Sequence, residues 1–179
     1  RRFRVHDADQ RDDHVQRGCE RVRSGVLMGS VYSATTEGEE ALAAATAETV
    51  IALIGSTVVK GRICEWGVSF DGTSSGGEPV RVRVLRLTAD DGTRTTSVTE
   101  AKWDPDTPAA NCIARHSYTV EPTKGDVLAD YDVHPQGGIV VQYPLGREIV
   151  LDDSTSAGVA IECTAAAIVN VVGYICWEE

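Results

Sequence analysis

The chain has 179 residues, of which 42% are hydrophobic, and a formal net charge of −10 at pH 7. This length suffices for one domain with a buried core, and no apolar run is long enough to span a membrane. Nucleic-acid binding requires clustered lysine and arginine, so the acidic balance argues against a nucleic-acid partner.

The first 27 residues differ from the rest of the chain. They hold seven arginines and five acidic residues without a sustained hydrophobic period. We expect residues 1–27 to be a charged arm, which leaves a net charge of −12 on a single β-domain, residues 28–179. Because Met28 is the only methionine, one hypothesis is that the natural start is Met28 and that residues 1–27 are a non-native extension. The alternative is a mobile basic arm that becomes ordered on a partner.

Two segments precede the regular part of the domain. Residues 29–36 are polar, and we interpret them as a lead-in to the first strand. Residues 37–46, EGEEALAAAT, are rich in helix-favouring alanine, leucine and glutamate. They are predicted to form either a short helix or the extended start of the next strand, because short segments are ambiguous.

From residue 48 onward, apolar or alternating runs are separated by clusters of turn-forming residues. The clearest pair is 62–70 and 79–88, in which apolar and polar residues alternate on both sides of a Gly/Ser-rich loop. The predicted strands are 48–55, 62–70, 79–88, 93–102, 112–120, 126–132, 138–143, 148–151, 157–164 and 167–177. Strands at this spacing without helices between them predict an all-β fold, an antiparallel β-sandwich of about eight to ten strands with jelly-roll-like topology.

Two of these strands have unusual patterns. In 79–88 the apolar residues move from the even-numbered to the odd-numbered positions after Val84, a change of phase. This change predicts a bulge or a strand that crosses between sheets. In 167–177 both parities are apolar. This strand is therefore expected to be central and covered on both sides, or to have one face against another subunit.

The cysteines and histidines suggest no strong metal site. The five cysteines form no C-x-x-C pair, so we interpret them as buried free thiols, with a disulfide between two of them left open. Cys112 and His116 lie four apart on one predicted strand and could bind zinc. No fourth ligand is indicated, so a hydrogen-bonded, half-buried His116 is preferred and no metal or other cofactor is expected.

Other motifs have structural interpretations. Residues 72–76 satisfy G-x-S-x-G, but a nucleophile elbow requires a following helix, and here a predicted strand follows. No catalytic residue is therefore predicted. The acidic pairs, among them Asp104 and Asp106, lie in turns, where aspartate caps backbone N–H groups. Trp66 and Trp177 fall on apolar strand parities and are expected in the core, whereas Trp103 at a strand end is expected to be exposed.

Seven segments in the same order resemble small all-β, virion-associated proteins of tailed actinobacterial bacteriophages and prophages. The segments are EWGVSFDGT (65–73), PVRVR (79–83), DPDTPAA (104–110), EPT (121–123), HPQGG (134–138), PLGRE (144–148) and WEE (177–179). The resemblance covers residues 40–179. It implies a non-enzymatic structural role as a head decoration (cement) or accessory capsid protein that binds the major capsid protein or another virion protein. It further implies a homo-oligomer, with a trimer favoured, on the capsid surface. The acidic charge favours a soluble protein when it is not assembled, and the lack of a long apolar run predicts no membrane partner.

Two sets of residues follow as candidates. Arg81 and Arg83 share the outward parity of their strand in an acidic domain, so we predict them to be subunit contacts. Replacing both with glutamate is expected to weaken assembly and leave the fold intact. The alternative function is a carbohydrate-binding β-sandwich module used for adsorption or lectin-like binding, in which Trp103 would stack on a sugar ring.

Overall fold

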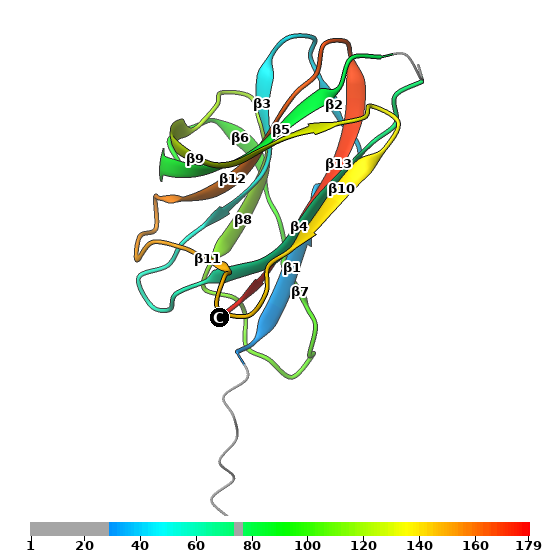
Figure 1. Ribbon diagram of the computed structural model, residues 1–179. Helices are drawn as coiled ribbons and strands as arrows, with labels where there is room; N and C mark the ends of the chain where they lie inside the picture. Colours follow the sequence, from blue (N-terminus) through cyan, green and yellow to red (C-terminus); the bar gives the residue numbers. More distant parts are fainter. Residues whose placement is uncertain (1–28, 74–76) are drawn as a thin grey trace, which may run out of the picture.

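Thirteen β-strands and no helix make up the part of the chain that the structure describes (Figure 1). The computed structural model describes residues 29–73 and 77–179. The predicted charged arm lies outside these residues. The strands are β1 Val31–Thr35, β2 Glu40–Leu42, β3 Ala47–Ile54, β4 Arg62–Phe70, β5 Val80–Ala89, β6 Arg94–Ser97, β7 Ala101–Lys102, β8 Ile113–Tyr118, β9 Thr123–Val133, β10 Gly138–Gln142, β11 Ile149–Val150, β12 Gly158–Thr164 and β13 Val169–Glu178.

The strands form two antiparallel sheets that pack face to face. The seven-stranded sheet has the order β10-β4-β13-β1-β7, with β11 also beside β4 and β2 also beside β13. The six-stranded sheet has the order β6-β8-β3-β12-β5-β9. The predicted all-β sandwich is thereby confirmed, whereas jelly-roll connectivity stays a prediction. A search of the described residues for a helix long and apolar enough to cross a membrane found none.

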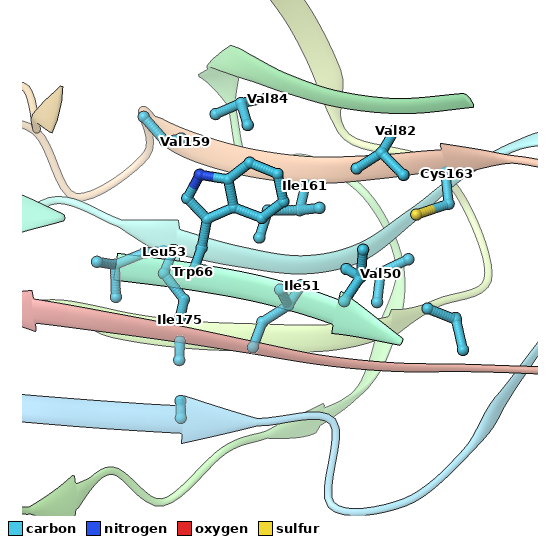
Figure 2. Close-up of a cluster of buried hydrophobic side chains, with 14 of the residues drawn as sticks. Val50, Ile51, Leu53, Trp66, Val82, Val84, Val159, Ile161, Cys163 and Ile175 are labelled. Carbon is cyan, nitrogen blue, oxygen red and sulfur yellow. The ribbon is translucent and has the colours of Figure 1, made fainter. Parts of the chain in front are cut away.

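The main core lies between the two sheets. Trp66 of β4 is fully buried, and Figure 2 shows its ring extending toward Val82, Val84, Val159 and Ile161 of the opposite sheet. These residues occupy alternate positions along their strands, as expected where one face of each sheet packs inward. Trp177 is also fully buried, so both tryptophans that were predicted for the core are confirmed there.

A smaller apolar cluster lies on the outer face of the six-stranded sheet. It comprises Ala52, Ile54, Leu85, Leu87 and Ala160, each at most 2% exposed, with Tyr118 packed against it. The connection from β8 to β9, residues 119–122, crosses this face. Its Glu121 accepts hydrogen bonds from Thr49 of β3 at one side, and β9 pairs with β5 at the other. The crossing segment therefore helps to bury apolar side chains that a two-layer sandwich would leave in water.

This outer cluster explains the phase change in β5. Leu85 and Leu87 lie on the outer face with Arg81 and Arg83, and β5 stays in one sheet throughout. The pairing with β12 is regular, whereas the register with β9 shifts between Val84 and Leu85 and again further along. The register shifts with β9 are an irregularity of the predicted kind, but β5 keeps its regular alternation of faces across Val84, so the phase change comes from the outer cluster. The predicted crossing between sheets is wrong.

Three sequence predictions need correction at the start and middle of the chain. Residues 31–35 are not a lead-in but strand β1, which buries Tyr32 and Ala34 against β13. Residues 37–46 contain no helix, so the helical alternative is wrong and β2 forms instead. The single strand predicted at 93–102 is two strands, β6 in the six-stranded sheet and β7 in the seven-stranded sheet.

The last strand, β13, is central in the seven-stranded sheet, between β4 and β1. Its inner face carries Val171, Ile175 and Trp177, all buried. Gly173 also faces inward, and a Cβ there would lie 2.8 Å from Val50 Cγ1, so glycine permits the close approach of the sheets. On the outer face Val172 is 38% exposed, so this strand is central but not covered on both sides within one chain.

Candidate functional site

The predicted contact residues Arg81 and Arg83 lie side by side with acidic groups on the outer face of the six-stranded sheet. In the register of β5 and β9, Arg83 is opposite Asp130 and Arg81 is opposite Asp132. The Arg81 Nε donates to both carboxylate oxygens of Asp130, at 2.9 and 3.0 Å, and its Nη2 forms an ion pair with the same group. This two-point contact with a guanidinium holds the pKa of Asp130 below its usual value.

Arg83 connects Asp130 to a buried carboxylate on the neighbouring strand. Its Nε lies 3.6 Å from Asp130 Oδ2, and its Nη1 lies 3.4 Å from Glu162 Oε1. Glu162 is the only charged residue of β12 and is 3% exposed. A carboxylate removed from water to this extent needs positive partners close by, and Arg83 supplies one of them.

Lys124 of β9 supplies the second cation. Its Nζ forms an ion pair with Glu162 Oε2 and lies 3.0 Å from Glu121 Oε2. Burial acts to lower the pKa of Lys124, but the bonds to Glu162 and Glu121 outweigh this effect, so the pKa is raised. Glu121 in turn accepts hydrogen bonds from the backbone N–H of Thr49 at 3.0 Å and from its hydroxyl.

These groups form one continuous set, which we term the outer-face ionic network. Its members are Arg81, Arg83, Glu121, Lys124, Asp130 and Glu162. The three cations and three acids bond mainly to one another, so the charges of the two arginines are compensated within the chain. The side chain of Arg81 is 49% exposed and that of Arg83 28%, which makes Arg81 the more accessible to a partner.

Sequence reasoning missed Lys124, Glu121 and Glu162, because the segment with Glu121 and Lys124 lies far in the chain from Glu162 and from the arginines of β5. One signal was available. Glu162 is a single charge within the apolar run GVAIECT, and a lone charge in a strand of that kind needs a partner. The identity of the partner depends on which strands are neighbours, which the sequence pattern does not give.

Cys112 and His116 do not form a joint site. Cys112 precedes β8 rather than lying in it, and its backbone N–H donates to Glu179 Oε1 at 2.7 Å. Burial raises the pKa of its thiol to about 12, so the thiol stays protonated at neutral pH. His116 is 5% exposed, more buried than predicted, and its Nδ1 lies 2.6 Å from Glu40 Oε1. Among the described residues no group of three or more metal-ligating side chains is found.

The other sequence candidates have structural roles where the structure describes them. Cys112, Cys163 and Cys176 are buried and free, as the preferred interpretation had it, whereas Cys64 is free but only partly buried. Cys19 lies outside the described residues. Asp104 caps its turn by accepting the backbone N–H of Asp106 at 3.0 Å, which confirms the capping role predicted for Asp104. Ser74, the serine at the centre of the G-x-S-x-G motif, lies outside the described residues, and the next element is strand β5 rather than a helix.

Trp103 follows β7 and is 67% exposed, as predicted. The ring contacts of the described aromatic residues join other pairs, Tyr32 with Trp177 and Trp66 with Tyr131. The indole of Trp103 therefore offers an accessible aromatic surface on the loop between β7 and β8.

A groove that the sequence did not suggest lies between β9 and the β10–β11 edge of the other sheet. It has a volume of about 520 Å³ and is lined in part by Leu128, Tyr131, Tyr143 and Val150. Arg86 closes one side by donating from Nη1 to the backbone oxygen of Val150 at 2.7 Å. The lining is largely aliphatic and aromatic, which suits an apolar contact better than a charged ligand.

Comparison of this chain with protein-family models, with curated proteins and with solved structures found no match.

Proposed function

We propose that this chain is a non-enzymatic structural protein of a tailed-phage virion, a head decoration or accessory capsid protein that binds capsid subunits. The observation that carries the proposal is the outer-face ionic network. The fold gathers its charged groups on one face of a rigid sheet, where they compensate one another and leave Arg81 half exposed. Such a surface favours docking to another protein over chemistry on a small molecule, which requires a group held ready to react.

Two further features support this role. The sequence resemblance to virion-associated β-proteins covers residues 40–179, which include every strand of the sandwich except β1. The antiparallel strands of two packed sheets also give a compact scaffold in which the backbone groups of the interior strands are paired. The expected partner is the major capsid protein or another virion protein, and a trimer on the capsid surface remains the favoured assembly.

The direct test is the protein content of purified particles. Virions from the phage or prophage that encodes this chain are isolated on a density gradient, and the chain is quantified against the major capsid protein by mass spectrometry. We expect a fixed ratio between the two proteins across gradient fractions. Absence of the chain from particles that contain the other head proteins would exclude the proposed role.

The contact surface is tested with particles that lack the chain. Recombinant chain is added, and the bound fraction is measured by co-sedimentation. Arg81→Ala is expected to reduce binding several-fold, because it removes the accessible cation of the network. The control is Lys60→Ala, which removes a cation that is also well exposed, from the ion pair with Asp153 elsewhere on the surface. Equal binding by the two variants would show that Arg81 makes no contact.

The exposed Trp103 favours one alternative, a carbohydrate-binding module. An accessible indole can stack on a sugar ring, and here it stands on a loop at the surface. In this case the wild-type chain would bind specific glycans on an array, and Trp103→Ala would lose that binding. The control is Leu145→Ala, which changes another exposed residue (93% exposed) and would keep the binding. An array without any bound glycan would count against this function.

A further inference from the structure

Strand β10 is an unprotected edge of the seven-stranded sheet. It lies beside β4 on one side only, as Figure 1 shows, and its sequence GIVVQ contains no charged residue. Val140 at its centre is 62% exposed. An edge strand of this kind can pair with another strand, so proteins usually block such edges with charges, proline or short length.

The other edges of the described sheets are blocked in these ways. β9 carries Lys124, Asp126, Asp130 and Asp132. The excess of aspartates would make the β9 edges of two copies repel each other. β7 has two residues, and β6 has four and begins with Arg94. Among the described edges of five or more residues, β10 alone is without charge.

The backbone of β10 has free hydrogen-bonding groups at defined positions. Gly137 accepts from the N–H of Phe70, and the N–H of Tyr143 donates to Cys64, so the odd-numbered residues bond to β4. In an antiparallel ladder successive residues point their N–H and C=O groups to opposite sides. The even-numbered residues Gly138, Val140 and Gln142 therefore direct theirs away from the sheet.

We propose that β10 pairs with β10 of a second copy of this chain, antiparallel, about a two-fold axis at Val140. Val140 then faces Val140 of the second copy, and Gly138 faces Gln142 at each end. Each of these three pairs exchanges two backbone hydrogen bonds, so about six bonds join the copies. The two seven-stranded sheets become one continuous sheet across the dimer.

The second copy is favoured as the occupant because the edge is complementary to itself. The outward-facing residues Gly138, Val140 and Gln142 are evenly spaced about Val140. A two-fold rotation at Val140 therefore places the bonding groups of one copy opposite those of the other, as a closed dimer requires. In this register the large residue Gln142 meets a glycine, and the two exposed valines bury apolar surface against each other. The inference does not depend on the virion role, since it concerns the isolated chain.

The net charge of −10 opposes association, whereas backbone bonds and valine contacts are insensitive to salt. The dimer is therefore expected to strengthen as salt is added. A contact made through Arg81 would weaken under the same conditions, so salt dependence separates the two surfaces.

The test is sedimentation equilibrium of the full chain over a wide concentration range. Val140→Pro removes an outward N–H that the monomer does not use, and so deletes two of the six bonds. Val140→Lys places two like charges across the axis. Both changes are expected to raise the dimer dissociation constant by about tenfold or more. Val140→Thr keeps the backbone N–H and a high strand propensity. It is expected to change the dimer dissociation constant by less than about threefold.

Register is tested by disulfide trapping. The Cα atoms of a hydrogen-bonded antiparallel pair are about 5.5 Å apart, which a disulfide can bridge. Under mild oxidation Val140→Cys is expected to cross-link to itself, and Gln142→Cys is not, because each copy's residue 142 faces Gly138.

A wild-type chain that stays monomeric at every concentration overturns the inference. So does an oligomer that Val140→Pro and Val140→Lys leave unchanged, including a trimer, which would still be compatible with the virion role. Conversely, a β10 dimer of a chain that is absent from virions would support this inference and exclude the proposed function alone.

Discussion

Glu162 is a buried carboxylate in the middle of a sheet, and the cations that pair with it come from two other strands. Arg83 contacts one oxygen of this carboxylate and Lys124 contacts the other. A buried pair gives little net stability compared with a well-packed apolar pair, but removal of one member leaves the others desolvated and unpaired. Replacement of Arg81 and Arg83 by glutamate would bring negative charge beside Glu162 and Asp130. We therefore now expect that double variant to disturb the fold as well as assembly.

Glu162→Ala is expected to lower the free energy of unfolding by about 2 kcal/mol, because Arg83 and Lys124 lose their buried partner but keep partial contact with water. Urea unfolding followed by circular dichroism measures the change. Asp153→Ala is the matched control, since its ion pair with Lys60 at 3.4 Å is well exposed. The control should change stability by less than about 0.5 kcal/mol. Equal effects of the two changes would contradict the role of burial.

Glu179 links the end of β13 to the loop before β8. Its carboxylate accepts hydrogen bonds from the backbone N–H groups of Asn111 and Cys112, at 2.8 and 2.7 Å, and from the indole N–H of Trp177 at 3.1 Å. Burial acts to raise the pKa of Glu179, but these bonds outweigh it, so its pKa is lowered from 4.5. The ionised carboxylate therefore stabilises the fold above pH 4.5, and this contribution is lost as the pH falls through the lowered pKa.

Glu179→Gln should accordingly be less stable than the wild type by about 1 kcal/mol at neutral pH. The difference should shrink toward zero in acid, where the wild-type carboxyl is also uncharged. Unfolding free energies of both proteins at several pH values between neutral and acid measure this trend. A difference that stays constant over that range would show that ionisation of Glu179 does not contribute.

At the scale of the elements, residues 37–46 show tertiary pairing overriding helix propensity. The segment contains one large apolar side chain, Leu42, which is 1% exposed because β2 pairs with β13. A helix of this sequence would have had no apolar stripe to bury, and propensity alone gives little stability to so short a helix. The turn that follows β2 places Ala45 at a φ of 55°, which a side chain disfavours.

Ala45→Gly is expected to stabilise the protein by about 0.5–1 kcal/mol, because glycine adopts this positive φ without steric cost. Ala43→Gly is the control. Ala43 has no positive φ, so glycine there only increases the freedom of the unfolded chain and should destabilise by a similar amount. Thermal unfolding of the two variants gives the comparison. If Ala45→Gly and Ala43→Gly both lose stability, the proposed backbone strain at Ala45 is contradicted.

At the scale of the whole molecule, the sequence predicts where strands form better than it predicts which strands pair with each other. The pattern of 62–70 yields β4 residue for residue, because one face is apolar and turn formers follow it. The short β1 and β2 were missed because each has only one or two buried side chains. The outer-face ionic network could not be predicted, since it requires β5 to lie between β12 and β9, and that order follows from long-range packing rather than from any local pattern.

The pairing of β1 with β13 has a consequence for how the chain could be rearranged. Ser30 and Glu179 exchange backbone hydrogen bonds of 2.9 and 3.0 Å, so the two ends of the sandwich lie one strand spacing apart. A few added residues could join them, and new ends could open at the exposed turn that contains Leu145. The sandwich could thus be circularly permuted. Its stability depends on which strands pair and not on the order in which they are synthesised.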